Sequence, residues 1–283
     1  MVIEARPARR PAATGPLWLL LAMMGCGRPG SVEASAPKKV PTAPAPAAQP
    51  ATTAAVERLT LEVVATYPHD PNAFTQGLLA AGEEMLESTG LYGRSSLRRV
   101  KLSTGERLAE VELPEGLFGE GLALVGDRLV QLTWQEHRAL LWSAGSFERL
   151  GELPYEGEGW GLCFDGEQLV MSDGSETLSL REPESFGLLA QVVVTRDGKP
   201  LPKLNELECV GGEVWANLWG SDEIVRIDRA SGQVTGVVDA SGLLPRAERA
   251  GTDVLNGIAY RPEKGTFLLT GKLWPKVFEV RIR

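Results

Sequence analysis

The sequence predicts an all-β fold, a five-bladed β-propeller with four antiparallel strands in each blade. Three observations lead to this prediction. Glycine is frequent, with 32 among 283 residues, and the apolar residues form short runs without sustained helical periodicity. One sequence pattern also recurs five times, at separations of 44, 40, 46 and 50 residues. A repeat of roughly 40–50 residues is typical of propeller blades. The five copies begin at Gln76, Glu120, Trp160, Glu206 and Asn256.

Each copy predicts the same succession of strands. A tight turn follows the opening run, as at Gly126-Asp127 and Asp165-Gly166, because glycine and aspartate tolerate the positive φ of short hairpins. A second β-rich run comes next, for example residues 128–132. An alternating run such as 224–228 follows it, and a further turn leads to a fourth run such as 107–111. These four strands make one blade.

The two ends of the repeat region predict how the ring closes. The last copy reaches only its third strand, at residues 277–281, before the chain stops. An alternating strand at residues 59–64 precedes the first copy. We expect this strand to pair in the last blade and to leave no long exposed edge. The alternative is a β-sandwich with chance repetition, which five aligned copies and complementary ends disfavour.

Residues 1–26 are interpreted as an export signal. Arg6, Arg9 and Arg10 precede an apolar run at residues 17–24 that is too short to cross a bilayer as a mature helix. Cys26 follows this run and Gly25, as in a bacterial lipobox, so Cys26 is the predicted lipidation site. The alternative is an ordinary signal peptide that is cleaved nearby. We expect an exported protein, either periplasmic or anchored to the outer membrane as a lipoprotein.

Composition divides the rest of the chain into two parts. Residues 27–56 are rich in proline and alanine and are predicted to form a disordered tether, which could connect a lipidated Cys26 to a folded domain. Residues 57–283 form the predicted propeller, which we expect to be a monomer. Cys163 and Cys209 lie in this part. Export permits a disulfide, but the sequence does not show whether their Cα atoms approach, so we expect buried free thiols.

The charge of the body disfavours nucleic acid as a partner. Beyond residue 55 the chain has 23 Lys and Arg against 35 Asp and Glu, a net charge of −12. Such a surface repels phosphate backbones. It attracts cationic peptide N-termini weakly, because salt screens most of that attraction.

The first position of the repeat varies in chemistry, although the apolar positions beside it keep their type. In a propeller this position surrounds one mouth of the central channel, and a few polar groups among apolar walls are typical of a ligand site. Four more side chains lie at the ends of the predicted second strands and should face the same mouth: Trp134, Asp173, Trp219 and Lys272. Trp215 instead lies within a strand and is expected in the core.

These residues belong to runs that together resemble plant-type glutaminyl-peptide cyclotransferases, a family found in latex plants and many bacteria. The runs are residues 74–78, 91–97, 119–122, 159–162, 204–208, 255–259 and 270–275. The resemblance covers about residues 59–283. It implies a five-bladed propeller that converts N-terminal glutamine of peptides and proteins to pyroglutamate and releases ammonia. It implies that catalysis needs no zinc or other cofactor, and members of the family can hold a structural calcium ion in the central channel.

The resemblance also implies roles for individual residues. Glu120 corresponds to the catalytic acid/base, and the substrate pocket corresponds to Gln76, Trp134, Trp160, Asn205, Trp219 and Lys272. The chemistry agrees with this, because an amine that attacks a carboxamide must lose a proton and ammonia must gain one. Lys272 or Asn205 could stabilise the oxyanion.

Two other polar residues of the mouth each have two possible interpretations. Glu206 could bind the substrate amine or backbone, or could form an ion pair within its blade together with Glu208. Asn256 could bind substrate or could be a turn residue.

Two other functions stay open. One is a non-catalytic propeller that binds peptides or cell-wall partners. The other is a metal-dependent propeller lactonase, with Glu120, Asp173 and Glu206 as conceivable ligands. The two histidines, His69 and His137, do not form a set with zinc-ligand spacing.

Overall fold

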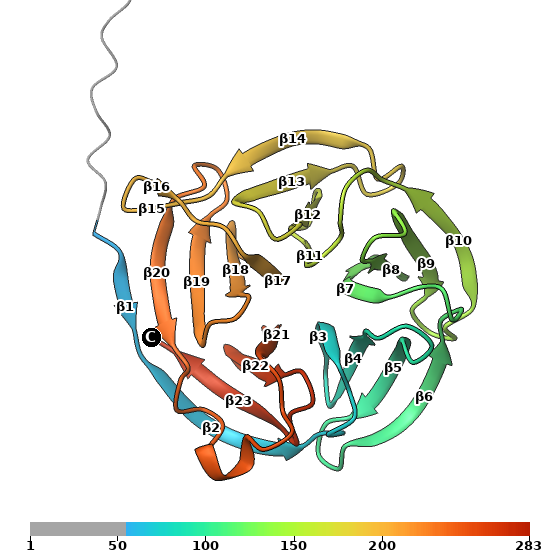
Figure 1. Cartoon of the computed structure of the whole chain (residues 1–283), viewed down its shortest axis with the longest axis horizontal. Coiled ribbons are helices and arrows are strands. Elements are labelled where there is room, and N and C mark those ends of the chain that lie inside the picture. The colour runs from blue at the N-terminus through green and yellow to red at the C-terminus, as the bar shows by residue number, and fades with distance from the viewer. Residues whose placement is uncertain (1–54) are drawn as a thin grey trace, which may run out of the picture. The chain divides into compact units, whose positions relative to one another are not determined.

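Five antiparallel sheets are arranged as the blades of a ring in the computed structural model, which describes residues 55–283 (Figure 1). The predicted five-bladed β-propeller is therefore confirmed. Blades one and two consist of β3 (Thr75–Ala81), β4 (Glu84–Thr89), β5 (Ser96–Lys101) and β6 (Glu106–Glu112), then β7 (Gly119–Val125), β8 (Arg128–Thr133), β9 (Arg138–Ser143) and β10 (Arg149–Pro154). Blade three consists of β11 (Leu162–Phe164), β12 (Leu169–Met171), β13 (Thr177–Arg181) and β14 (Leu188–Val193). In each blade the first strand lies nearest the ring centre (Figure 1).

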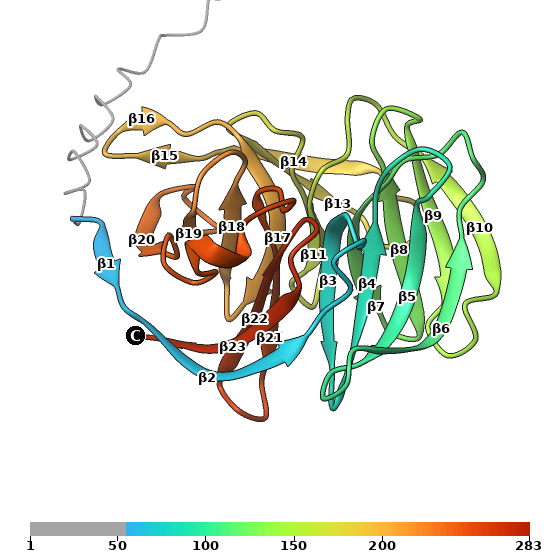
Figure 2. The same cartoon turned by 60° about the horizontal axis from the view of Figure 1, so that its bottom comes forward.

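Blades four and five recruit the start of the described chain. Blade four contains β17 (Leu204–Val210), β18 (Glu213–Leu218), β19 (Glu223–Asp228) and β20 (Val234–Asp239), and blade five contains β21 (Leu255–Arg261), β22 (Thr266–Gly271) and β23 (Lys276–Ile282). β2 (Leu61–Pro68) pairs antiparallel with β23 as the fourth strand of blade five, which confirms the predicted closure. The sequence did not predict β1 (Glu57–Leu59), which pairs parallel with β20 and adds a fifth strand to blade four. The N-terminal segment therefore joins the outer edges of two blades (Figure 2).

The core lies between blades, because each sheet presents apolar side chains to both of its neighbours. The second strand shows this best: residues 129–133 of β8 are all buried. Leu86 and Leu97 of blade one pack in one cluster with Leu122 and Leu129 of blade two. The outermost strands β6, β10 and β14 are mostly exposed. Trp215 is 5% exposed and packs on Phe267 between blades four and five, in the core as expected.

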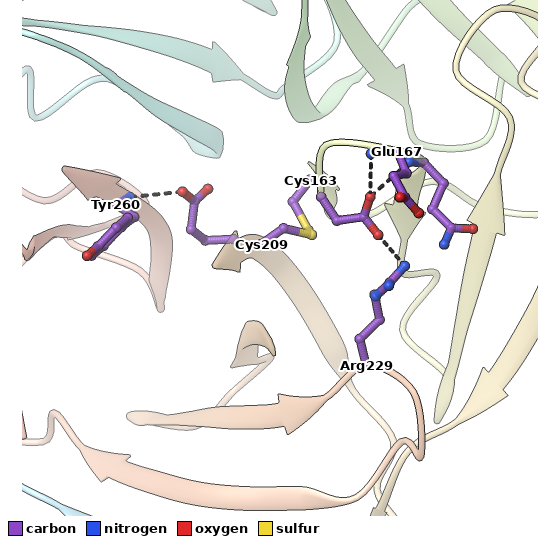
Figure 3. Close-up of a disulfide and its surroundings, with 8 residues drawn as sticks. Cys163, Glu167, Cys209, Arg229 and Tyr260 are labelled. Atoms are coloured by element: carbon purple, nitrogen blue, oxygen red, sulfur yellow. Dashed lines mark hydrogen bonds and ion pairs between the residues drawn. A yellow bond between two sulfur atoms is a disulfide. The ribbon is translucent and has the colours of Figure 1, made fainter. Parts of the chain in front are cut away.

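A disulfide joins the innermost strands of blades three and four (Figure 3). Cys163 on β11 and Cys209 on β17 have Cα atoms 5.5 Å apart, within the usual range for a disulfide. The expectation of free thiols is wrong, because neighbouring inner strands converge near the channel. Close by, Asp165 pairs with Arg229, and Glu208 accepts a hydrogen bond of 3.0 Å from the backbone N–H of Tyr260 (Figure 3).

Small elements complete the description. A hairpin of β15 (Thr195–Arg196) and β16 (Lys199–Pro200) lies beside blade four (Figures 1 and 2), and a 3-10 turn spans Arg246–Glu248. None of the described residues forms a helix of the length and hydropathy that a membrane span requires. The predicted export signal, Cys26 and nearly all of the predicted tether lie outside the described residues and remain predictions.

Candidate active site

A cavity of about 390 Å³ opens at the mouth of the channel where the inner strands begin. The side chains that form it come from the start of the inner strand in blades one to four and from the end of the second strand in blades two, four and five. Its walls are Phe74, Gln76, Phe118, Glu120, Trp134, Trp160, Asn205, Trp219 and Lys272. The predicted acid/base Glu120 and all six residues of the pocket that the resemblance implies therefore meet in one place.

β-bulges fix which residues point to this cavity. In β3, β7, β17 and β21 the pairing register shifts by one residue at the start of the strand. In the fourth blade the shift lies between Leu204 and Leu207, so Asn205 occupies the position that Gln76 and Glu120 occupy in blades one and two. The alignment that placed Glu206 in this column is off by one residue, because Glu206 occupies the next position, where the other four blades have glycine.

Glu120 lies at the end of a buried chain of hydrogen bonds. Gln76 Nε2 donates to Glu120 Oε1 at 2.8 Å, and Asn256 Nδ2 donates to Gln76 Oε1 at 3.3 Å and to the carbonyl oxygen of Thr75 at 2.9 Å. Glu120 is 5% exposed. Burial raises the pKa of Glu120 well above its usual value. The charge of Lys272 opposes this rise, and the charges of Glu136 and Glu158 add to it.

Lys272 supplies a positive charge to the same cavity. It directly follows β22, and its Nζ lies 4.8 Å from the ring centroid of Phe74. Burial lowers the pKa of Lys272, while the carboxylates of Glu120 and Asp253 raise it. Asn205 is 2% exposed, and within residues 55–283 its Nδ2 has no hydrogen-bond partner. A buried donor without a partner at a cavity wall is suited to a ligand oxygen.

Aromatic rings form the rest of the wall. Trp160 packs edge-on against Trp219 with ring centroids 6.1 Å apart, and Phe118 lies 5.6 Å from Trp134 and 6.2 Å from Phe74. The indole N–H groups of Trp134 and Trp160 both donate to Glu158 Oε2, at 2.8 and 3.0 Å. An apolar wall with few placed polar groups is typical of small-ligand sites.

Comparisons with known proteins agree with this geometry. The sequence profile of one family, described as glutamine cyclotransferase, matches residues 37–282. The chain belongs to the glutamine cyclotransferase family. A relative from Arabidopsis thaliana named glutaminyl-peptide cyclotransferase is 42% identical over 229 residues, which are 79% of this chain and 71% of the relative. The crystal structure of Myxococcus xanthus glutaminyl cyclase superposes with a TM-score of 0.75 at 42% identity, covering 80% of this chain and 98% of that one.

Three residues expected at the mouth lie elsewhere in this family member. Asp173, Glu206 and Asn256 do not line the cavity. Asp173 is followed by Gly174, where an added Cβ would lie 2.7 Å from the indole of Trp160, so the missing side chain makes room for that ring. Asn256 acts behind Gln76, as described above.

Glu206 is buried and joins three blades. Its Oε1 accepts the N–H of Leu78 at 3.2 Å and its Oε2 accepts the N–H of Ile258 at 2.7 Å. Glu206 therefore forms neither a wall of the cavity nor an ion pair with a neighbouring side chain among residues 55–283. Burial and the charge of Glu208 raise its pKa well above the usual value.

The side chains of the described region do not assemble a calcium site. Among residues 55–283 no three His, Cys, Asp or Glu side chains come together. Both carboxylate oxygens of Glu206, in the channel, already accept backbone N–H groups. Calcium takes six to eight oxygen ligands, which the described side chains alone do not supply, and the channel calcium remains a prediction from the resemblance.

The sequence missed Phe74, Phe118 and Glu158. Each lies two residues before the first position of its repeat, at Gln76, Glu120 and Trp160 respectively. This constant offset from the first position is the signal that could have found them, although all three precede the inner strands.

Proposed function

We propose that this protein is a glutaminyl-peptide cyclotransferase, which converts the N-terminal glutamine of a peptide to pyroglutamate and releases ammonia. The observation that carries the proposal is a buried carboxyl group, Glu120, beside the buried ammonium of Lys272 in an indole-lined cavity. Family membership and the names of the two relatives support the same activity.

The reaction forms one C–N bond and breaks another within a single residue. The neutral α-amine attacks the γ-carboxamide carbon, the carbonyl oxygen takes up negative charge, and the carbonyl reforms as ammonia leaves. Glu120 takes the proton that the amine gives up and delivers it to the leaving nitrogen. A carboxyl whose pKa is raised toward the working pH can perform both transfers.

Lys272 and Asn205 stabilise the oxyanion in this mechanism. Both line the cavity with Glu120, and the unpartnered Nδ2 of Asn205 is a donor that does not have to break a bond to another described residue. Burial strengthens the electrostatic effect of Lys272, because the low-dielectric surroundings screen its charge weakly.

The aromatic walls select the folded-back substrate. Because both reacting groups belong to one residue, the enzyme has to hold the conformer in which they meet. A cavity of about 390 Å³ walled by Trp134, Trp160 and Trp219 restricts an extended side chain. Gln76, held by Asn256, orients Glu120 for the transfer.

Glu120→Gln tests this mechanism. The substitution keeps an acceptor for the Gln76 amide and removes the titrating group. With a Gln-initiated peptide we expect ammonia release to fall by roughly 10²–10⁴-fold, with an unchanged thermal unfolding midpoint. The matched control is Glu112→Gln on an exposed position of β6, which should retain full activity. Parent-level rates in Glu120→Gln would overturn the role of Glu120.

The two alternative functions give different results in the same assay. A peptide- or cell-wall-binding propeller would bind the Gln peptide and leave its mass unchanged, whereas the cyclotransferase lowers the mass by one ammonia. A metal-dependent lactonase would hydrolyse lactones and lose activity with a chelator. Glu120, Asp173 and Glu206, the conceivable ligands of that enzyme, do not line one cavity.

Export as a periplasmic or outer-membrane lipoprotein is part of the proposal. The Cys163–Cys209 disulfide supports an oxidising compartment. Mass spectrometry of the membrane fraction should find a lipid-modified Cys26 at the mature N-terminus. A mature chain without a modified Cys26 would refute the lipid anchor. Export by an ordinary signal peptide would then be the remaining interpretation. Size-exclusion chromatography with light scattering tests the expected monomer.

A further inference from the structure

Glu158 links two walls of the cavity through one carboxylate oxygen. It precedes β11 by four residues and is partly buried. Its Oε2 accepts Trp134 Nε1 at 2.8 Å and Trp160 Nε1 at 3.0 Å, while its Oε1 accepts Gln135 Nε2 at 2.9 Å. Trp134 follows the second strand of blade two, and Trp160 precedes the inner strand of blade three. The carboxylate therefore fixes two indoles from different blades relative to each other.

The remaining contacts of these indoles explain why a fixed orientation matters. Trp160 packs on Trp219 and on the backbone at Gly174, and Trp134 packs on Phe118. These contacts are apolar and leave the direction of the indole N–H open, whereas a hydrogen bond from that N–H fixes it. Without Glu158, each N–H at the cavity wall would turn to water or to the substrate.

The charge of Glu158 is kept by the same hydrogen bonds. Burial alone would raise the pKa of Glu158, but the bonds from Trp160, Gln135 and Trp134 outweigh it and lower the pKa. The ionised carboxylate in turn raises the pKa of Glu120, together with Glu136 and against Lys272.

We propose that Glu158 is a positioning residue for the cyclisation, which locks Trp134 and Trp160 as the walls that hold the folded-back substrate. The inference rests on the proposed cyclotransferase activity. Its second consequence is electrostatic: removing the Glu158 charge lets Glu120 ionise at lower pH, while Lys272 and Glu136 stay in place.

Three variants separate the two effects. Glu158→Ala removes the acceptor and the charge, and Glu158→Gln keeps one acceptor oxygen and removes the charge. Glu156→Gln, at an exposed position two residues earlier, is the matched control. All three are compared with the unaltered protein by thermal unfolding, to establish that they fold, and by kcat, KM and the pH dependence of kcat with a Gln-initiated peptide.

For Glu158→Ala we expect kcat/KM to fall roughly ten- to hundredfold, because two charge-assisted hydrogen bonds are lost. Acrylamide should also quench its tryptophan fluorescence more strongly in the absence of substrate. Glu158→Gln should show a smaller loss, and in both variants the acid limb of kcat should move to lower pH. Glu156→Gln should match the parent throughout.

Two results would overturn the proposal. One is a Glu158→Ala protein with the kcat/KM, pH profile and quenching of the parent. The other is equal losses in Glu156→Gln, which would indicate a general effect of charge near the mouth. If the unaltered protein itself leaves the peptide uncyclised, the proposed function falls and the catalytic part of this inference falls with it. The quenching comparison needs no substrate and still decides whether Glu158 anchors the indoles.

Discussion

Removing the Cys163–Cys209 disulfide should destabilise the propeller by a calculable amount. The bond closes a loop with a sequence separation of 46 residues between adjacent inner strands. In the chain-entropy treatment, a cross-link over that separation restricts the unfolded chain by the equivalent of about 4 kcal/mol. The perturbation is the double variant Cys163→Ser and Cys209→Ser, or reduction of the native protein.

Urea unfolding followed by tryptophan fluorescence measures this effect. A domain of this size has a denaturant slope of roughly 2–3 kcal/mol per molar urea, so the midpoint should fall by roughly 1.3–2 M. Reductant should lower the midpoint of the native protein to that of the double variant. It should leave the variant itself unchanged, which controls for other effects of the reagent.

A thiol count gives the refuting result. The chain has three cysteines, so a protein with the disulfide exposes at most one free thiol, that of Cys26, when denatured without reductant. Two or more free thiols, or equal midpoints with and without reductant, would refute the cross-link and the stability argument built on it. They would also remove the structural support for an oxidising compartment.

Four further outcomes are expected. Lys272→Met should lower kcat by roughly 10²–10³-fold in the ammonia assay with little change in folding, because it removes the charge proposed to stabilise the oxyanion. The acid limb of kcat should lie well above pH 4.5, the ordinary carboxyl value, because burial raises the pKa of Glu120 and the base must be ionised. Gly161→Ala should lower the thermal midpoint, because the new Cβ would lie 2.0 Å from the carbonyl oxygen of Asn205. Glu87→Gln should destabilise the protein at pH 7. Burial opposes ionisation of Glu87, but the ion pair with His69 at 3.0 Å outweighs burial and lowers the pKa of Glu87. The difference in free energy of unfolding between Glu87→Gln and the parent, measured by urea titration, should therefore vanish as pH falls through that lowered pKa.

The architecture could be predicted well from the sequence because each blade corresponds to one copy of a sequence repeat. The glycine and aspartate turns, the apolar second strands and the incomplete last copy each depend on local residues, and together they imply closure by the N-terminal strand. β1 could not be foreseen in the same way. Its three residues have no recognisable sequence pattern. They pair parallel with β20 because β1 directly precedes the closing strand β2 and lies along the outer edge of blade four.

The site was predicted less completely, and for physical reasons that differ from residue to residue. Asn205 and Glu206 are adjacent, and blade four lacks the glycine that follows the cavity-facing residue in the other four blades, so the sequence did not show which of the two faces the cavity. The disulfide depended on a Cα distance that no sequence pattern contains.

Glu206 shows how the ring positions the catalytic mouth. The equivalent position is glycine in the other four blades, and at Gly77, Gly121 and Gly161 an added Cβ would collide with the backbone of the next blade. Inner strands can therefore approach closely at those three positions. In blade four the carboxylate of Glu206 instead accepts backbone N–H groups from β3 and β21. One side chain thus connects blade four to the blades that carry Gln76 and Asn256, and it lies directly after Asn205. We infer that this contact, made behind the cavity wall, keeps Asn205 and the Gln76–Glu120 pair in register across the channel.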